Sequence, residues 1–350
     1  MSRMKATIAA GVEFWNDSCV PAELSDAVEH GAAGATSNPV IVYTAIKADP
    51  KTWTPVLDGL IAARPQALED EVAWALIEAL GVKAAAILAP VHQATRGGKG
   101  FLSMQVNPKL YPDSERMVEH GRTLAAVAPN VAVKVPATAA GLKAAEELVA
   151  SGVNVNATVS FTVSQAVAVA EAFERGLDRA RARGADMHAL HPYATLMLGR
   201  LEDHLQRVMV KEGIAVDPAC ISRAGIAVFK RAREVFRERG YRATLLAAAY
   251  RHHLHWSELI GPGIVQSIPY AWWKQFEASD IEVQPTLDRP VDPAVVEMLG
   301  RRFEDFRRAY GVGTLATEEF ARFGPTIHTL NQFIGGYQDL LGLVRERMLR

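Results

Sequence analysis

The stretch Val131-Ala132-Val133-Lys134-Val135-Pro136-Ala137 decides the fold of this chain. Its β-branched and small apolar residues predict a buried strand. Because apolar residues occupy both alternating phases, we expect the strand to be covered on both faces, as in a parallel α/β sheet. One lysine, Lys134, interrupts the run, and burial disfavours its ammonium form.

Two interpretations of Lys134 follow from this segment alone. Burial lowers the pKa of a lysine towards neutrality, and the neutral amine is the form that attacks a ketone. Lys134 would then be a Schiff-base nucleophile. Alternatively, it stands at the end of the strand and extends its charged head into water.

The composition is that of a globular protein. The chain has 350 residues, enough for one large domain or two smaller ones, and 49% of them are hydrophobic. Its formal net charge of −1 gives no sign of a nucleic-acid partner. Cys19 and Cys220 are the only cysteines and cannot form a disulfide framework, so we expect a reducing compartment.

Targeting and membrane signals are weak. Residues 1–12 contain too short an apolar stretch for a signal peptide. No uninterrupted apolar run reaches the length of a membrane span. We therefore expect a soluble cytoplasmic protein that does not associate with membranes.

Short apolar segments alternate with helical patterns along the chain, which indicates a parallel sheet with right-handed crossovers. The candidate strands cover residues 12–17, 33–38, 101–106, 131–137, 153–160, 189–198, 243–250 and 263–268. Eight such units predict an α/β fold of the (β/α)8 class, the TIM barrel. A doubly wound sheet is the alternative, but no GxGxxG fingerprint follows the first strand.

Helical patterns are clearest over residues 113–127, 140–150, 163–182 and 217–239. Two further helical regions, residues 53–95 and 293–350, exceed a minimal barrel. We expect residues 1–350 to form a single barrel domain, with 293–350 as a C-terminal helical extension packed on it. Each addition could wrap the barrel or contact another subunit.

Polar side chains recur where the candidate strands end, which is where a (β/α)8 barrel carries its chemistry. Singly they have ordinary explanations: Asp17 as a helix cap, and Asn38 before Pro39 as a turn. Together they suit a phosphorylated, polyhydroxylated carbonyl compound held over an amine nucleophile. The candidate residues are Asp17, Thr36, Asn38, Gln105, Lys134, Asn156, Thr158, Thr195, Arg200 and Arg251.

Three motifs resemble those of a known family. They are Gly34-Ala-Thr-Ser-Asn-Pro39, Val133-Lys-Val-Pro-Ala-Thr138 with Gly141, and Gly152-Val-Asn-Val-Asn-Ala-Thr158. The chain resembles the transaldolases, class I aldolases that form a Schiff base on the fourth strand of a (β/α)8 barrel. Our count of strands independently places Lys134 on the fourth. Residues 267–269 and 315–343 resemble the family more loosely.

The resemblance implies roles for the residues around the nucleophile. Lys134 would form the imine with a donor ketose, and Asp17 would take the proton of its C4 hydroxyl as the C3–C4 bond breaks. Asn38 and Asn156 would hydrogen-bond the dihydroxyacetone unit. Thr158 would help to position the catalytic water.

The resemblance also implies the substrates. Arg200 and Arg251 would bind the phosphate, and Thr36 and Thr195 would contact the substrate. The reaction would transfer a dihydroxyacetone unit from sedoheptulose 7-phosphate or fructose 6-phosphate to an aldose phosphate, in the pentose phosphate pathway. It needs neither a metal ion nor an organic cofactor, and the family suggests a homodimer.

The chain departs from the family at several positions, including Asn16 and Cys19 after the first strand. Gln105 stands where most transaldolases have a glutamate that activates water, and glutamine cannot take a proton. The related fructose-6-phosphate aldolases have glutamine there, but they also have a tyrosine where this chain has Met197. Thr195 and Ala249 replace serines. An aldolase of the same mechanism, an enzyme for an unusual sugar, and a non-catalytic sugar-phosphate binder are therefore the alternatives.

The segment Arg251-His252-His253-Leu254-His255 invites a metal interpretation. There is no HExxH pattern, and no carboxylate cluster with ligand spacing lies beside it in the sequence. We interpret these residues as histidines on a helix after the seventh strand, one of which could line the phosphate pocket. We expect no metal.

Overall fold

The computed structural model describes residues 2–350, in which eight parallel strands close into a barrel. The strands are β1 (Glu13–Asn16), β2 (Gly34–Thr36), β3 (Phe101–Gln105), β4 (Val131–Pro136), β5 (Val155–Thr158), β6 (Tyr193–Met197), β7 (Thr244–Ala248) and β8 (Ile264–Ile268). Each lies within a strand predicted from the sequence. The (β/α)8 barrel is therefore confirmed.

The barrel interior is filled by side chains rather than open. All six residues of β4 are buried, as the apolar run predicted. The rings of Trp15 on β1 and Tyr193 on β6 have centroids 4.7 Å apart, although these two strands do not pair. The rings therefore meet across the interior, and Asn16 and Asp17 follow Trp15 towards the C-terminal end of β1.

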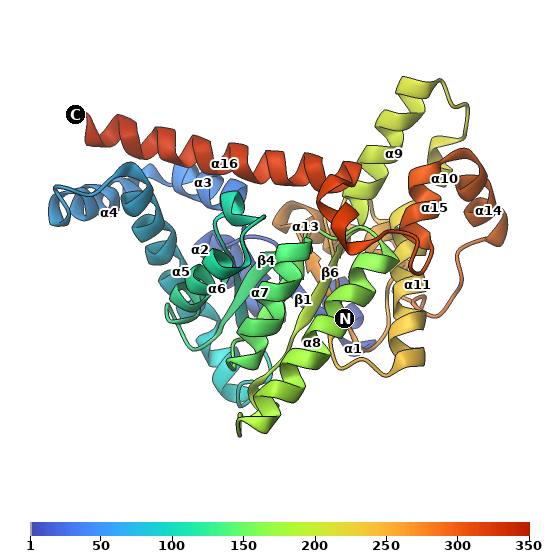
Figure 1. The fold of residues 1–350 in the computed structure, drawn as a ribbon, viewed down its shortest axis with the longest axis horizontal. Coiled ribbons are helices and arrows are strands. Elements are labelled where there is room, and N and C mark those ends of the chain that lie inside the picture. The colour runs from blue at the N-terminus through green and yellow to red at the C-terminus, as the bar shows by residue number, and fades with distance from the viewer. Residues whose placement is uncertain (1) are drawn as a thin grey trace.

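Helices alternate with the strands and surround them (Figure 1). Up to β5 they are α1 (Arg3–Ala9), α2 (Pro21–Glu29), α3 (Pro39–Ala48), α4 (Pro50–Ala63), α5 (Glu69–Ala94), η1 (Pro108–Leu110), α6 (Ser114–Ala125) and α7 (Ala139–Ala150). Between β5 and β8 they are α8 (Val163–Ala182), η2 (Met187–Ala189), α9 (Leu198–Glu212), α10 (Pro218–Ile221), α11 (Ala224–Arg239) and α12 (Leu254–Ser257). The last group is α13 (Tyr270–Ala278), α14 (Pro293–Arg302), α15 (Glu304–Tyr310), η3 (Thr317–Arg322) and α16 (Gly324–Met348).

The prediction of one helix over residues 217–239 is wrong, because α10 ends at Ile221 and α11 begins at Ala224. Near the start of α11, the backbone N–H of Gly225 donates to Oε1 of Glu202 over 3.3 Å. Only the first residues of a helix have N–H groups free for such a bond. The break therefore lets α11 begin against α9.

The N-terminal segment forms a helix that the sequence analysis did not identify. Within residues 1–12, Met1 lies outside the described residues and Arg3–Ala9 is α1. This helix packs against α13 and buries Met4 and Thr7. The hydroxyl of Thr7 accepts a 3.0 Å hydrogen bond from the indole of Trp256.

Among residues 2–350, α5 is the one helix long and apolar enough to cross a membrane. Its most apolar 18-residue window has a mean hydropathy of 1.8, and 56% of that window is buried inside the protein. There it packs against β3 and α16. A core helix passes the same test, and the sequence analysis did not single α5 out because it considered only uninterrupted apolar runs.

The long helix α16 crosses the top of the molecule in Figure 1 and packs against α3, α5 and α9. It comes close to α3 at Gly336, where a Cβ atom would lie 2.6 Å from Cγ2 of Val40 at the start of α3. Since α3 begins directly after β2, α16 lies at the C-terminal end of the barrel. The candidate residues of the sequence analysis lie at this same end of the barrel, where the strands end.

Candidate active site

Lys134 points into a buried environment on β4. Its side chain is 5% exposed, so its head does not extend into water. Nζ donates a hydrogen bond of 3.3 Å to the carbonyl oxygen of Ser37. Burial lowers the pKa of Lys134, the charge of Asp17 offsets part of that effect, and the charge of Arg200 adds to it. The amine is thus easier to deprotonate than that of an exposed lysine.

Two other candidate residues flank Lys134 in register. Gln105 on β3 and Asn156 on β5 are its Cα partners, so all three side chains leave the sheet on the same face. The amide of Asn156 is held at both ends: Nδ2 donates to Ser103 Oγ over 3.0 Å, and Oδ1 accepts from Thr195 Oγ1 over 2.7 Å. Asn156 is therefore fixed in orientation.

Asp17 and Thr36 are joined at the ends of β1 and β2. The hydroxyl of Thr36 donates to Oδ1 of Asp17. Oγ of Ser267 on β8 lies 2.8 Å from the same hydroxyl oxygen. Because the Thr36 hydrogen is already used, Ser267 is the donor in that contact. The carboxylate of Asp17 is thus held by a chain of hydroxyl groups.

Asn38 and Thr158 are less directly connected to the lysine. Oδ1 of Asn38 caps α3 by accepting from the N–H groups of Val40 and Ile41, each at 3.0 Å. Its NH2 group remains for another partner. Thr158 is fully buried at the end of β5, and its hydroxyl lies 3.8 Å from the sulfur of Met197.

Arg200 lies in the first turn of α9, beneath α16. Its Nη1 donates to Oε1 of Gln332, and its guanidinium carbon lies 5.5 Å from the ring centroid of Phe333, both on α16. Burial, together with the nearby charge of Arg251, lowers the pKa of Arg200 to about 10. Nε is buried and has no hydrogen-bond partner among the described residues. The side chain could therefore still bind an anion.

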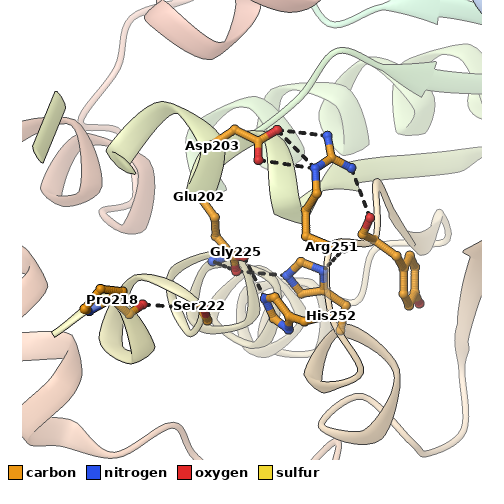
Figure 2. A network of polar contacts seen from close by, with 9 residues as sticks. Glu202, Asp203, Pro218, Ser222, Gly225, Arg251 and His252 are labelled. Atoms are coloured by element: carbon orange, nitrogen blue, oxygen red, sulfur yellow. Dashed lines mark hydrogen bonds and ion pairs between the residues drawn. The ribbon is translucent and has the colours of Figure 1, made fainter. Parts of the chain in front are cut away.

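Arg251 follows β7 and pairs with Asp203 of α9 (Figure 2). Its Nη2 lies 2.8 Å from Oδ2 of Asp203, and Nε lies 3.2 Å from both carboxylate oxygens. Nη1 donates to the carbonyl oxygen of Tyr250 over 3.0 Å. The Arg251 side chain is 40% exposed, and its charge affects the pKa of Arg200, so the two guanidinium groups occupy one region.

Sequence reasoning missed several residues that hold the candidates in place. Ser103 could have been found, because it lies two residues before Gln105 and so faces the same side of β3. Asp203 could have been found as the residue one helical turn after Arg200. Ser267 lies in a segment that loosely resembles the family, but neither Ser267 nor Gln332 gave a signal of its partner, since each meets that partner only through the fold.

One group among residues 2–350 has the composition of a metal site: Glu202, His252 and His255, whose potential ligand atoms lie within 4.8 Å of one another. The sequence analysis found no carboxylate cluster with ligand spacing beside these histidines. The fold supplies one, because α9 brings Glu202 against the segment that follows β7.

The assembled residues combine a buried amine, a carboxylate, oriented amide and hydroxyl groups, and two arginines at one end of the barrel. A neutral amine can attack a carbonyl carbon and form an imine. Two guanidinium groups suit a phosphate by charge and geometry. This arrangement can support carbon–carbon bond chemistry on a phosphorylated ketose.

Comparisons with known proteins agree with this arrangement. Residues 14–310 match the family described as Transaldolase/Fructose-6-phosphate aldolase. The chain is 31% identical to Transaldolase 1 of Streptomyces avermitilis, over 74% of this chain and 75% of that protein. It is 27% identical to a transaldolase of an Arthrobacter species, over 95% of this chain and 94% of that protein. The chain therefore belongs to the transaldolase/fructose-6-phosphate aldolase family.

Proposed function

We propose that this protein is a transaldolase that acts through an imine on Lys134. It transfers a dihydroxyacetone unit from sedoheptulose 7-phosphate or fructose 6-phosphate to an aldose phosphate, as a step of the pentose phosphate pathway. The observation that carries the proposal is the buried Lys134, whose pKa is lowered by burial, between Gln105 and Asn156 at the C-terminal end of the barrel.

The first half of the reaction breaks the donor. The neutral amine of Lys134 attacks the donor ketone, and loss of water leaves a protonated imine. Asp17 takes the proton of the C4 hydroxyl, the C3–C4 bond breaks, and its electron pair moves into the imine to give an enamine. The C4 carbon leaves as the aldehyde of an aldose phosphate. Asp17 is now protonated.

The second half reverses these steps on another aldehyde. The enamine attacks the acceptor aldehyde, and Asp17 returns its proton to the new C4 oxygen. Water then hydrolyses the imine and frees Lys134. Thr158 and Gln105 position this water. During the exchange of aldehydes, Asn156 and the NH2 group of Asn38 hold the enamine by donating hydrogen bonds to the dihydroxyacetone oxygens.

The polar contacts of the structure support these assignments in detail. One hydrogen of the Asn156 amide is used by Ser103, and the second remains for the substrate. Thr195 acts through its hydrogen bond to Asn156, and Thr36 acts through Asp17. Arg200 and Arg251 bind the phosphate, with Arg200 exchanging Gln332 for it.

The transfer reaction is tested directly by assaying Lys134→Met. The methionine keeps the volume of the site but has no amine. Wild-type protein should convert a ketose phosphate and an aldose phosphate into exchanged products, and the variant should show no transfer above background. Transfer at the wild-type rate by a folded Lys134→Met protein would disprove the imine mechanism.

Gln105 favours a second candidate, a fructose-6-phosphate aldolase-like reaction that releases free dihydroxyacetone. Oε1 of Gln105 is buried, has no hydrogen-bond partner among the described residues, and belongs to the register partner of Lys134. An amide can orient water but cannot take its proton. Coupled assays with and without an acceptor aldehyde separate the two reactions, because only the aldolase forms free dihydroxyacetone without an acceptor.

Two alternatives differ in substrate or in chemistry. Thr195, Met197 and Ala249 depart from the family pattern, which favours a sugar of a specialised pathway. A panel of ketose phosphates tests this directly. A non-catalytic relative would bind sugar phosphates without forming an imine, and the buried Lys134 argues against it because simple binding does not need a buried amine.

The proposal also concerns the organisation of the protein. We place all 350 residues in one barrel domain, with residues 293–350 as an extension that packs on it through α16. We expect a cytoplasmic protein, because the family acts on soluble sugar phosphates, and a homodimer, which sedimentation equilibrium would measure. The reaction as written uses no cofactor.

A further inference from the structure

A buried carboxylate, Glu202, is joined to the backbone of Arg251 through His255. Oε1 of Glu202 lies 2.9 Å from Nε2 of His255, and Nδ1 of His255 lies 3.1 Å from the backbone nitrogen of Arg251. The Glu202 and His255 side chains are 3% and 0% exposed. A charge buried this deeply is costly unless it is fully hydrogen-bonded. The hydrogen bonds of Glu202 and His255 indicate the role of this buried charge.

The direction of each hydrogen bond follows from the backbone amide. The N–H of Arg251 can only donate, so Nδ1 of His255 accepts and its proton lies on Nε2, which donates to Glu202. Burial lowers the pKa of His255, and the charge of Glu202 offsets part of that effect. Burial raises the pKa of Glu202, but hydrogen bonds from His252 and His255 more than offset it. The pair is thus a carboxylate and a neutral imidazole.

Two further donors complete the environment of Glu202. Nε2 of His252 lies 2.9 Å from Oε2, and the backbone N–H of Gly225 donates to Oε1 over 3.3 Å. Figure 2 shows Glu202 of α9 between Gly225 of α11 and His252, which follows β7. The carboxylate therefore connects the start of α11 with the segment that carries Arg251.

The same hydrogen-bond pattern argues against a metal at this cluster. A metal ligand needs a free lone pair, and Nε2 of His255 carries a hydrogen. Freeing that lone pair would move the hydrogen to Nδ1, where it would face the N–H of Arg251. Coordination would therefore break the bond to the backbone of Arg251.

We propose that Glu202 and His255 are positioning residues that fix Arg251 for phosphate binding, an inference that rests on the proposed function. β7 is followed by Ala249 in the left-handed region, with φ of 63°. Two residues later, the backbone N–H of Arg251 donates to Nδ1 of His255, which fixes the backbone there. A Cβ on Gly199 would lie 2.4 Å from Cγ of Arg251, so this position has no room for a larger side chain beside the arginine.

One turn of α9 thus contacts or carries both arginines. Arg200 lies in this turn. Glu202 in the same turn acts on the backbone of Arg251 through His255, and Asp203 pairs with the guanidinium of Arg251. Asp203 holds the guanidinium group of Arg251 but not its backbone N–H. Glu202 and His255 supply the constraint on that N–H.

A pair of substitutions at His255 separates the two halves of this connection. His255→Asn keeps an acceptor near the position of Nδ1, for the N–H of Arg251. His255→Gln keeps a donor near the position of Nε2, for Glu202, but has no acceptor for that N–H. We expect His255→Gln to raise KM for fructose 6-phosphate by about tenfold, as for one lost buried hydrogen bond, with kcat within about twofold. His255→Asn keeps that acceptor but loses the donor to Glu202, so its KM should rise by less than that of His255→Gln, by about threefold.

Comparison with an unphosphorylated ketose shows whether the effect is specific to the phosphate. KM for fructose should be unchanged in both variants. His253→Asn, at an exposed neighbouring histidine, is the matched control and should resemble wild type. Equal losses on both ketoses, or a loss in His255→Asn as large as in His255→Gln, would overturn the inference. So would a bound metal ion in purified protein that the His255 variants lose.

A binding measurement keeps the inference separate from the proposed function. Stabilisation of the protein by inorganic phosphate, followed as a rise in Tm, should be smaller in His255→Gln than in His255→Asn. If wild-type protein forms no imine but the two His255 variants still differ in their response to phosphate, the proposed function fails and the positioning role stands. If all variants respond to phosphate equally, the positioning role fails whatever the reaction.

Discussion

Gln105 and Lys134 are register partners on the adjacent strands β3 and β4, and both side chains are buried. A charge placed at position 105 would therefore act on the amine in addition to the charges of Asp17 and Arg200. An amide there adds no charge, so burial remains the main influence on the pKa of Lys134. A substitution at position 105 can therefore have two separate effects, one on the pKa of the Lys134 amine and one on the activation of water.

Gln105→Glu tests both effects. A carboxylate beside Lys134 should raise the pKa of the amine, which moves the acidic limb of the pH–rate profile to higher pH. At the new optimum the carboxylate can take a proton from water, so transfer should be faster by about tenfold or more. The measurement is kcat/KM against pH, with Gln105→Leu as an uncharged control. An unshifted acidic limb would contradict the proximity of the two groups.

The bond from Thr195 to Asn156 predicts a matched pair of variants. Thr195→Val keeps the shape but removes the donor to Oδ1 of Asn156, so the amide is held at one end only. We expect kcat/KM for transfer to fall by about tenfold, as for a lost buried hydrogen bond. Thr195→Ser keeps the hydroxyl and should stay close to wild type. Equal activity in the two variants would show that the hydroxyl has no role.

Two neighbouring glycines of α16 test whether this helix lies against the barrel. A Cβ at Gly336 would lie 2.6 Å from Cγ2 and 3.0 Å from Cα of Val40, whereas none of the surrounding atoms lies within 4 Å of a Cβ at Gly335. Gly336→Ala should lower the free energy of unfolding by about 1 to 3 kcal/mol through overpacking. Gly335→Ala should raise it by about 1 kcal/mol through helix propensity. Urea unfolding measures both, and equal effects would contradict the placement of α16.

The buried Lys134 should lower the free energy of unfolding by an amount that depends on pH. Because burial lowers the pKa of Lys134, the unfolded chain binds more protons than the folded chain between the two pKa values, and stability rises with pH through that window. The cost is fully present below the folded pKa and disappears above the pKa of a free lysine. Lys134→Met removes it.

The free energy of unfolding of Lys134→Met should therefore exceed that of wild type at neutral pH, and the difference should shrink as pH rises towards that of free lysine. Urea unfolding at several pH values measures it. Lys143→Met, at an exposed lysine of α7, is the control. A methionine variant that is less stable than wild type at neutral pH would show that the ammonium is well solvated in the folded protein.

The barrel could be predicted because its signals are local. Each strand is a short apolar run bounded by turn residues, and every observed strand lies inside a predicted one. The position of Lys134 on the fourth strand followed from the same count. Residues 163–182 form α8 as predicted, because one continuous amphipathic pattern carries that helix.

Which side chains pair at the site could not be predicted, since the partners come from distant parts of the chain. Gln332 lies 132 residues beyond Arg200, and Asp203 precedes Arg251 by 48 residues. Near the break between α10 and α11, Gly225 donates to Glu202, a pairing that no local pattern in the sequence indicates. Sequence showed which chemical groups are present, whereas only the fold showed which of them pair.

The most direct test of the account is borohydride trapping with fructose 6-phosphate, followed by peptide mass mapping. Reduction of the imine would leave a stable adduct of dihydroxyacetone or of the intact sugar. The account predicts that this adduct lies on Lys134 and is missing from Lys134→Met. An adduct on another lysine, or no adduct from any ketose phosphate with folded protein, would contradict it.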